Sequence, residues 1–436
     1  MSGQFALLKT RRFLPMFLTQ FLGAFNDNVF KQAMVLLLTF QAADALGLSV
    51  SLLNNLAAML FILPYFLFSA AAGQLADKYA KDWLSVKIKQ LELVIMLLAS
   101  VAFVCEIYWL LFVALFLMGT HSTFFGPVKY AYLPQVLHKD EMVGGNAFFQ
   151  TGTSMAILTG MMLGGTVIAG SGEHHLIWTS ITVVAIALLG WITAKQIPPT
   201  PSLDPQLKID WNVWRTSVQT LGDAWRLPRV FYAIIGISWF WYYGATFLTQ
   251  IPQFTKELLH GDESVVILLL TLFSIGVATG SLLCRRLLNN QVSLKLLPLG
   301  MIGLTVFACD LYFSLTGLSP QATLQSLSQI VGQAPYWRVF VDLAGIGLFG
   351  GFYIVPLYAF MQAHAPESHR ARIIAANNIL NALFMVASAI VALLVLGLWS
   401  QSLPQLFVLT AVMNVAVCLL VIRKTRATPV SVSSPH

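Results

Sequence analysis

Ionisable side chains occupy the middle of the first long apolar segment, residues 13–42, which is long enough to cross a bilayer as one helix. Asp27 lies between Asn26 and Asn28, and Lys31 follows Asp27 by four residues. Residues four apart share one face of a helix, and an acid that precedes a base is the better order for a pair. Charged groups at membrane depth are costly, so they usually face a bundle interior or a water-filled path. The spacing therefore predicts a helix whose charged face lines a transport pathway.

A buried structural ion pair is the alternative interpretation of Asp27 and Lys31. Such a pair contributes little net stability, because the desolvation of two charges offsets their attraction. A role in a pathway explains these residues better. The same choice arises at Lys129, near the end of the fourth apolar segment: it either faces the pathway or extends to the membrane surface. His121, two turns earlier, is more often a core histidine than a proton carrier.

Aromatic residues take the corresponding place in the second half of the chain. The seventh apolar segment reads Trp241-Tyr242-Tyr243-Gly244 at the depth where the first segment carries Asp27. Charge on one side of a cavity and aromatic surface on the other would suit an amphiphilic ligand. Aromatic residues that face lipid would give the same pattern.

The elements that must position these residues are membrane helices. Hydrophobic residues make up 57% of the 436 residues and charged residues only 10%, with a mean hydropathy of +0.76. A soluble chain of this length would carry more charge, and the alternating pattern of a membrane β-barrel is absent. We expect no cleavable signal peptide. The four cysteines are spaced as unpaired core residues, and neither a metal nor a cofactor is expected.

Twelve apolar segments have the length of a membrane-spanning helix. They cover residues 13–42, 51–73, 84–105, 107–131, 146–170, 175–195, 230–254, 263–284, 294–316, 337–362, 373–398 and 402–422. With both termini in the cytoplasm, most of the 25 lysine and arginine residues, Lys87 and Lys89 among them, fall in cytoplasmic segments. This bias accounts for the net charge of +7 without nucleic acid as a partner.

Weak internal repetition divides the chain into two halves. The fourth segment ends with Pro127 and a Tyr-Ala-aromatic step, and the tenth does the same from Pro356. Such repeats are typical of transporters. We predict an all-α membrane protein with two six-helix bundles. Its parts are residues 1–195, a cytoplasmic linker at 196–229 with an interfacial helix, residues 230–424, and a polar tail at 425–436.

The sequence GQLADKYAK at residues 73–81 resembles the loop signature of the major facilitator superfamily. Gly73 permits close helix packing, Asp77 can pair with cations and helix ends, and Lys81 supplies a base. The resemblance implies a latch that stabilises one conformation. A basic loop that obeys the positive-inside rule is the alternative. The corresponding loop at residues 280–286 lacks the acid, so any latch should be stronger in the N-terminal half.

Three segments together resemble the bacterial lysophospholipid transporters, a family within that superfamily. They are QFLGAFNDNVFKQA at 20–33, GQLADKYAK at 73–81 and FGPVKYAYLP at 125–134. The resemblance implies movement of lysophospholipids, such as lysophosphatidylethanolamine, across the inner membrane to its inner leaflet. It implies that Asp27 and Lys129 meet the headgroup. The family's charged residues of the C-terminal half have no match in the seventh segment, which leaves the exact substrate open.

We therefore predict a secondary transporter that works by alternating access and is not an enzyme. Its predicted substrate site comprises Asn26, Asp27, Asn28, Lys31, Lys129, Trp241 and Tyr242, with membrane lipids as neighbours. No P-loop occurs, so we expect no direct drive by ATP hydrolysis. No His-x-x-x-x-Asp acyltransferase pair occurs either, so an acyltransferase acting on the cargo would be a separate protein. The alternatives are a proton-coupled transporter of a small amphiphile, with Asp27 as the proton carrier, and a membrane enzyme or lipid-binding scaffold built around His121.

Overall fold

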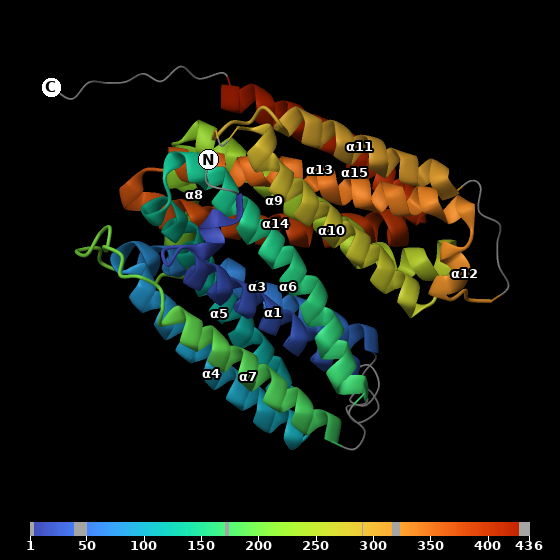
Figure 1. The fold of residues 1–436 in the computed structure, drawn as a ribbon, viewed down its shortest axis with the longest axis horizontal. Coiled ribbons are helices and arrows are strands. Elements are labelled where there is room, and N and C mark those ends of the chain that lie inside the picture. Colours follow the sequence, from blue (N-terminus) through green and yellow to red (C-terminus); the bar gives the residue numbers. More distant parts are fainter. Residues whose placement is uncertain (1–3, 39–49, 171–173, 290, 316–322, 427–436) are drawn as a thin grey trace.

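The computed structural model describes residues 4–38, 50–170, 174–289, 291–315 and 323–426. Within these ranges, twelve helices have at least 18 residues (Figure 1). They are α1 (Leu14–Leu37), α3 (Val50–Lys78), α4 (Lys81–Val104), α5 (Tyr108–Val136), α6 (Met142–Gly170), α7 (His175–Ala194), α9 (Pro228–Leu258), α10 (Glu263–Leu287), α11 (Leu297–Ser314), α13 (Ala334–His364), α14 (Arg370–Ala392) and α15 (Leu403–Arg426). The shorter helical elements are η1 (Gln4–Lys9), η3 (Lys139–Glu141), α8 (Val213–Trp225), α12 (Leu327–Val331), η6 (Glu367–His369) and η7 (Leu393–Leu398).

Ten helical segments of the described chain are long and apolar enough to cross a membrane by length and composition. The long helices outside this set are α1 and α4, and α4 carries five charged residues: Lys81, Asp82, Lys87, Lys89 and Glu92. Hydropathy alone therefore gives ten spans where the sequence analysis predicts twelve. Both helices pack inside the first bundle, α1 against α6 and α4 against α7, where charged side chains can find partners.

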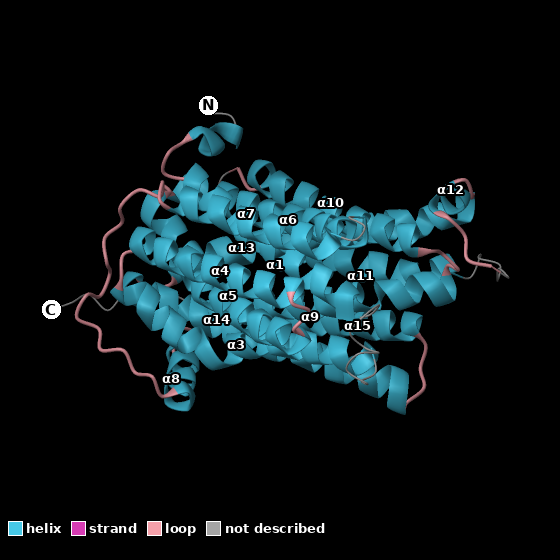
Figure 2. Cartoon of the chain, turned by 90° about the horizontal axis from the view of Figure 1, so that it is seen from below, coloured by secondary structure: helices cyan, strands magenta, loops and turns pink. Residues whose placement is uncertain are grey.

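The long helices form the predicted two bundles. Within the first half, α1 packs on α6 and α3 on α5; within the second, α10 packs on α13 and α9 on α14. The halves meet through α3 with α14 and through α6 with α10. Figures 1 and 2 show that α1 begins and α15 ends at the end of the molecule where α8 lies. We call this the terminal end, and the opposite one the distal end.

Glycines allow the closest helix contacts inside each bundle. A Cβ atom at Gly164 of α6 would lie 2.4 Å from the carbonyl oxygen of Val29 on α1. A Cβ atom at Gly280 of α10 would lie 1.9 Å from the carbonyl oxygen of Leu348 on α13. Both distances are shorter than any real contact, so only glycine permits these backbone approaches.

Helix boundaries differ from the prediction around residues 73–81. α3 continues to Lys78 and α4 begins at Lys81, so most of the predicted loop is helical and only Tyr79 and Ala80 separate the two helices. Lys89, predicted in a cytoplasmic segment, lies within α4, and its side chain is 0% exposed. The last predicted residues of the first helix, 39–42, lie outside the described residues.

The linker before α8 is attached to the end of α3. The backbone N–H of Asp210 donates to Gln74 Oε1 at 2.8 Å, and the Ser202 hydroxyl donates to the Lys78 carbonyl at 2.6 Å. Asn212 caps α8 by accepting from the backbone N–H of Arg215. The Asn212 backbone N–H and the Arg215 side chain hold the pKa of Asp210 below its usual value.

The predicted interfacial helix exists as α8, and its apolar side chains face outward. Trp211, just before α8, is 66% exposed, and Trp214, Val218 and Trp225 along the helix are 68%, 69% and 65% exposed. Tryptophan is favoured at the level of lipid headgroups. The location of α8 in the membrane interface stays a prediction.

Candidate functional site

A cavity of about 470 Å³ lies between the two bundles. Its walls come from both halves of the chain. From the first half they comprise Gln20, Gly23, Ala24, Asp27, Asn28, Lys31, Gln32, Val35, Ala57, Ala58, Phe61, Ile62, Tyr65, His121, Ser122, Phe125, Gly126, Lys129, Tyr130, Gln150, Thr153 and Ile157. From the second half they comprise Trp241, Tyr358, Asn378, Asn381, Ala382 and Met385.

The charged residues of the cavity all lie on the first bundle. Asp27 accepts a hydrogen bond of 2.6 Å from the Ser122 hydroxyl through Oδ2, and its Oδ1 has no hydrogen-bond partner in the structure. Lys31 Nζ lies 4.9 Å from the centre of the Phe61 ring. Among the described residues, Asp27 and Lys31 form no ion pair within 4.0 Å. The alternative of a structural pair therefore has no support, and both groups remain available to a ligand.

Lys129 belongs to the same wall. It lines the cavity from α5, and its Nζ lies 5.0 Å from the centre of the Tyr130 ring. The α5 helix continues to Val136, two turns beyond Lys129. This extension keeps the lysine inside the bundle rather than at the helix end, so two bases, Lys31 and Lys129, line the cavity together with Asp27.

Asn26 faces a different neighbour from Asp27. Its Nδ2 donates to Glu92 Oε1 on α4 at 2.9 Å, and Asn26 is not among the cavity-lining residues. Glu92 also accepts from Lys89 Nζ at 2.5 Å, and His121 Nε2 lies 3.2 Å from Glu92 Oε2. We call Asn26, Lys89, Glu92 and His121 the buried charge cluster.

Two members of this cluster were not expected from the sequence: Lys89 is predicted there in a cytoplasmic segment, and Glu92 is not singled out. Asn26, predicted as a substrate-site residue, belongs to the cluster instead. A usable signal was present, because Lys89 and Glu92 are three apart in a largely apolar segment. That spacing predicts a pair on one helix face.

Aromatic side chains form the facing wall. Trp241 Nε1 donates to the Tyr358 hydroxyl at 3.3 Å, and the Tyr358 ring stacks on Tyr130 with 4.6 Å between ring centres. Tyr242 does not line the cavity: it is 3% exposed and stacks on Trp239 at 4.7 Å.

Amide side chains of α14 add polar groups to this second wall. Asn378 and Asn381 line the cavity, and Asn381 Oδ1 accepts from the Ser238 hydroxyl at 2.9 Å. Asn378 Nδ2 has no hydrogen-bond partner in the structure. The second bundle therefore offers aromatic surface and neutral hydrogen-bond donors and contributes no charged residue to the cavity lining.

Asp77, a predicted latch residue, connects the two bundles at the terminal end. Its carboxylate accepts from the backbone N–H of Ala371 at 3.0 Å, from the backbone N–H of Arg372 at 3.3 Å and from Arg372 Nε at 3.0 Å. An acidic group is favoured there because the first N–H groups of a helix have no partner within it. Asp77 thus holds the start of α14.

Gly73 and Lys81, the other two predicted latch residues, have different contacts. A Cβ atom at Gly73 would lie 2.7 Å from the Ala375 Cβ, so this glycine lets α3 approach α14. Lys81 Nζ is buried without a hydrogen-bond partner among the described residues, and the Lys81 backbone N–H donates to the Thr200 hydroxyl oxygen at 3.0 Å. The backbone of Lys81 therefore contacts the linker.

Further bonds join the bundles near the terminal end. The amides of Asn146 on α6 and Gln362 on α13 donate to each other, at 2.8 and 3.1 Å. The Thr151 hydroxyl donates to the Ala278 carbonyl on α10 at 3.3 Å. Together with Asp77, these contacts hold the terminal end of the bundles closed.

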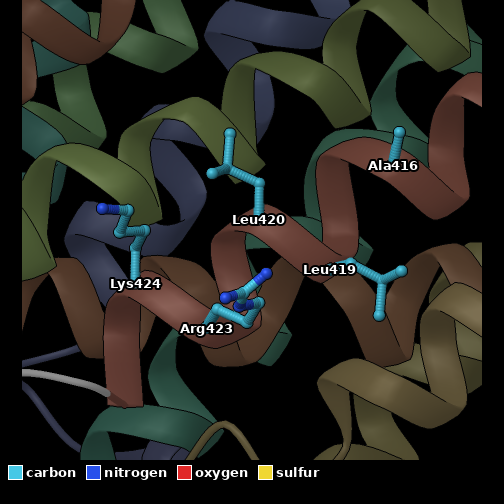
Figure 3. A pocket seen from close by; sticks show the side chains of 5 residues that line it. All are labelled: Ala416, Leu419, Leu420, Arg423 and Lys424. Carbon is cyan, nitrogen blue, oxygen red and sulfur yellow. The ribbon is translucent and has the colours of Figure 1, made fainter.

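A second pocket, of about 410 Å³, follows the outside of α15. Its lining residues are Ala416, Leu419, Leu420, Arg423 and Lys424 (Figure 3). All five lie on one helix, and Leu419 and Leu420 are exposed. A surface on a single helix cannot alternate between two sides of the membrane, so the central cavity is the candidate site.

Comparisons with known proteins bear on the family of this chain. The family model of the Major Facilitator Superfamily matches residues 16–383. The lysophospholipid transporter LplT of Serratia proteamaculans is 25% identical over 400 residues, covering 90% of this chain and 89% of the relative. The transporter of the same name from Citrobacter koseri is 27% identical over 357 residues, covering 80% and 79%. The resemblance predicted from the three sequence segments is confirmed.

The fold also matches a solved structure. The crystal structure of the human organic anion transporter MFSD10 (TETRAN) has a TM-score of 0.70 and covers 94% of this chain and 99% of that one. The identity is 14%, so this likeness speaks for the fold alone.

Proposed function

Because the chain belongs to the major facilitator superfamily and is therefore a multi-pass membrane transporter and not an enzyme, we propose that its cargo is a lysophospholipid. The observation that carries this proposal is the two-sided cavity. Charged groups line it from α1 and α5, whereas aromatic rings line it from both halves, with Trp241 and Tyr358 as those of the second half. A ligand with a charged head against the first half and an apolar body along the aromatic surface matches this lining.

The headgroup would lie against the first bundle. Lys31 and Lys129 have ammonium groups without a carboxylate within 4.0 Å among the described residues, so a phosphate can pair with either. The unpartnered Oδ1 of Asp27 can accept from an amine. This arrangement supports a zwitterionic head of the lysophosphatidylethanolamine type. The names of the LplT relatives support the same substrate class.

The mechanism we propose is alternating access. Contacts of Asp77, Asn146 and Thr151 close the terminal end, and opening there would require α3 to leave α14 and α6 to leave α10. With both termini in the cytoplasm, as the distribution of basic residues predicts, the described state is the one closed toward the cytoplasm. Release would then occur at the inner leaflet, where a separate acyltransferase would use the product.

A small amphiphilic solute is the second candidate. The cavity volume of about 470 Å³ lies within the range of ordinary small-molecule sites. Such a solute would need no opening between the bundles, whereas the acyl chain of a lysolipid would need one.

The test is uptake of labelled lysophosphatidylethanolamine into cells that express the chain, with a cytosolic acylation step to trap the product. Asp27→Asn keeps the size of the side chain and removes its charge, and we expect it to lower uptake by about tenfold or more, the value of one charge-assisted hydrogen bond. Asp82→Asn, on α4 and outside the cavity lining, is the control and should retain uptake. Wild-type uptake in Asp27→Asn would refute the site assignment. Uptake no greater than in cells without the protein would favour the small solute.

A further inference from the structure

The outer face of α15 carries a groove that is separate from the central cavity. Its lining residues are spaced as positions i, i+3, i+4, i+7 and i+8 of one helix face: Ala416, Leu419, Leu420, Arg423 and Lys424 (Figure 3). Leu419 and Leu420 are 49% and 43% exposed. From Ala416 to Lys424 the helix rises about 12 Å. One leaflet of the hydrocarbon core is about 15 Å deep, so the groove has the length of an acyl chain in one leaflet.

Two bases without an acidic partner lie at one end of this groove. Arg423 and Lys424 are exposed, and neither forms an ion pair with any described residue. The guanidinium of an arginine fits a phosphate with two parallel hydrogen bonds, and a lysine adds a second charge. The groove therefore has one basic end and one apolar end, which is the polarity of a phospholipid with an acidic head.

A chain of aromatic side chains indicates that the basic end lies at the level of lipid headgroups. Lys424 Nζ lies 5.8 Å from the centre of the Tyr232 ring on α9. Tyr232 packs edge-on against Phe231 at 5.8 Å between ring centres, and Phe231 packs edge-on against Trp225 of α8 at 4.8 Å. Trp225 is 65% exposed. Tryptophan and tyrosine are enriched at membrane interfaces, where anionic headgroups attract lysine and arginine.

Other occupants match this face less well. In a symmetric dimer the same patch would meet itself, so the bases of both copies would lie together without an acid between them. Residues 427–436, which follow α15, contain no aspartate or glutamate and so offer the two bases no acidic side chain. A lipid phosphate supplies the missing negative charge, and its acyl chain covers the exposed leucines.

We infer that the groove on α15 binds one anionic diacyl phospholipid, with its phosphate against Arg423 and Lys424 and an acyl chain along Leu420, Leu419 and Ala416. This lipid stays at the outer surface and is not the cargo, so the inference does not depend on the proposed function. The groove exists only while α15 is folded against α9 and α11. A lipid that binds the folded state alone stabilises it by mass action, so the bound lipid stabilises the second bundle.

The test is native mass spectrometry of the purified full chain, titrated with phosphatidylglycerol and, separately, with phosphatidylethanolamine of the same acyl chains. We expect one tightly bound phosphatidylglycerol and a clear preference for it over the zwitterionic lipid. Each basic residue near a lipid headgroup strengthens binding by roughly fivefold. Arg423→Gln with Lys424→Gln should therefore weaken phosphatidylglycerol binding by roughly 30-fold and remove the preference. Lys9→Gln with Arg11→Gln removes two exposed bases from the same end of the molecule and is the matched control, which should bind as wild type.

A second variant tests the apolar end without changing any charge. Ala416→Trp fills the groove, and because Ala416 is exposed the new side chain meets no packed neighbour. We expect it to weaken phosphatidylglycerol binding while both bases remain.

Three outcomes would overturn the inference. Equal binding of the two lipids by the wild type would mean a nonspecific annular layer only. Phosphatidylglycerol binding that survives in Arg423→Gln with Lys424→Gln would belong to another part of the molecule. Wild-type dimers that Ala416→Trp disperses would mean that a second copy covers the groove. The proposed function is tested by uptake of lysophospholipid, so its failure would leave this lipid site standing.

Discussion

Replacing Asp77 by asparagine tests the latch most directly. The carboxylate accepts two backbone N–H groups at the start of α14 and the Nε of Arg372. Asparagine keeps one acceptor oxygen, but it loses the ion pair and the interaction with the helix N-terminus. Hydrogen bonds to a charged group contribute about 1.5–3 kcal/mol each, and an acidic group at a helix start about 0.3–1 kcal/mol.

Arg372 is partly solvated, with 16% of its side chain exposed. Because solvent weakens the ion pair, we expect Asp77→Asn to destabilise the closed state by about 2 kcal/mol, near the lower end of these contributions. All of these contacts join α3 to α14, so they are lost when the terminal end opens. Asp77→Asn should therefore raise the ratio of open to closed molecules by about 30-fold, at 1.4 kcal/mol per factor of ten.

The assay is a distance distribution between spin labels at Lys78 on α3 and Glu367 in η6, on opposite sides of this contact. We expect the wild type to populate mainly the short distance and Asp77→Asn a longer one. Asp82→Asn is the control, because Asp82 accepts from Thr200 in the linker and does not bridge the bundles. An unchanged distribution in Asp77→Asn would refute the assignment of Asp77 as a latch.

Other substitutions test the cavity and its supports. Lys129→Ala should lower lysophospholipid uptake by about tenfold, since it removes a charged partner of the phosphate, while Lys87→Ala should leave uptake unchanged. Glu92→Ala should destabilise the protein by about 3–5 kcal/mol in thermal unfolding, because it leaves a buried lysine unpaired, whereas the exposed Glu257→Ala should cost under 1 kcal/mol. Gly164→Leu should abolish folded protein on size-exclusion chromatography, because its side chain would overlap the backbone of α1; a monodisperse product with wild-type uptake would contradict this packing.

The sequence predicts the helices well because each bilayer-length apolar run must satisfy its backbone hydrogen bonds internally. It predicts the cavity less well, since adjacent residues of a helix point about 100° apart. The segment Asn26-Asp27-Asn28 looks like one polar site, yet Asn26 bonds to α4 while Asp27 and Asn28 line the cavity. Likewise Trp241 lines the cavity and Tyr242 packs on Trp239. Periodicity tells which residues share a face, but the neighbour of that face depends on tertiary packing.

The same limit explains the buried charge cluster. Counting Lys89 as a cytoplasmic charge follows from the positive-inside rule, which does not consider partners on other helices. Glu92, Asn26 and His121 come from three helices, and only the packing of α4 against α5 and of α1 against α5 brings them within reach of one another. The spacing of Lys89 and Glu92 predicts a pair on one face of α4, but it does not show which other helices that pair meets.

The stack of Tyr130 on Tyr358 joins the two bundles beside the cavity. Tyr130 lies on α5 beside Lys129, whose ammonium group lies over its ring, and Tyr358 lies on α13 and receives the indole N–H of Trp241. Both rings line the cavity, and they come from opposite bundles. Opening of the terminal end must separate these rings as well as break the Asp77 contacts. A phosphate that draws Lys129 away from Tyr130 removes one of the contacts that hold the ring in place. Under the proposed mechanism, occupancy of the cavity and opening of the terminal end would both act on the stack of Tyr130 and Tyr358, which is the physical requirement for a carrier that moves only when it is loaded.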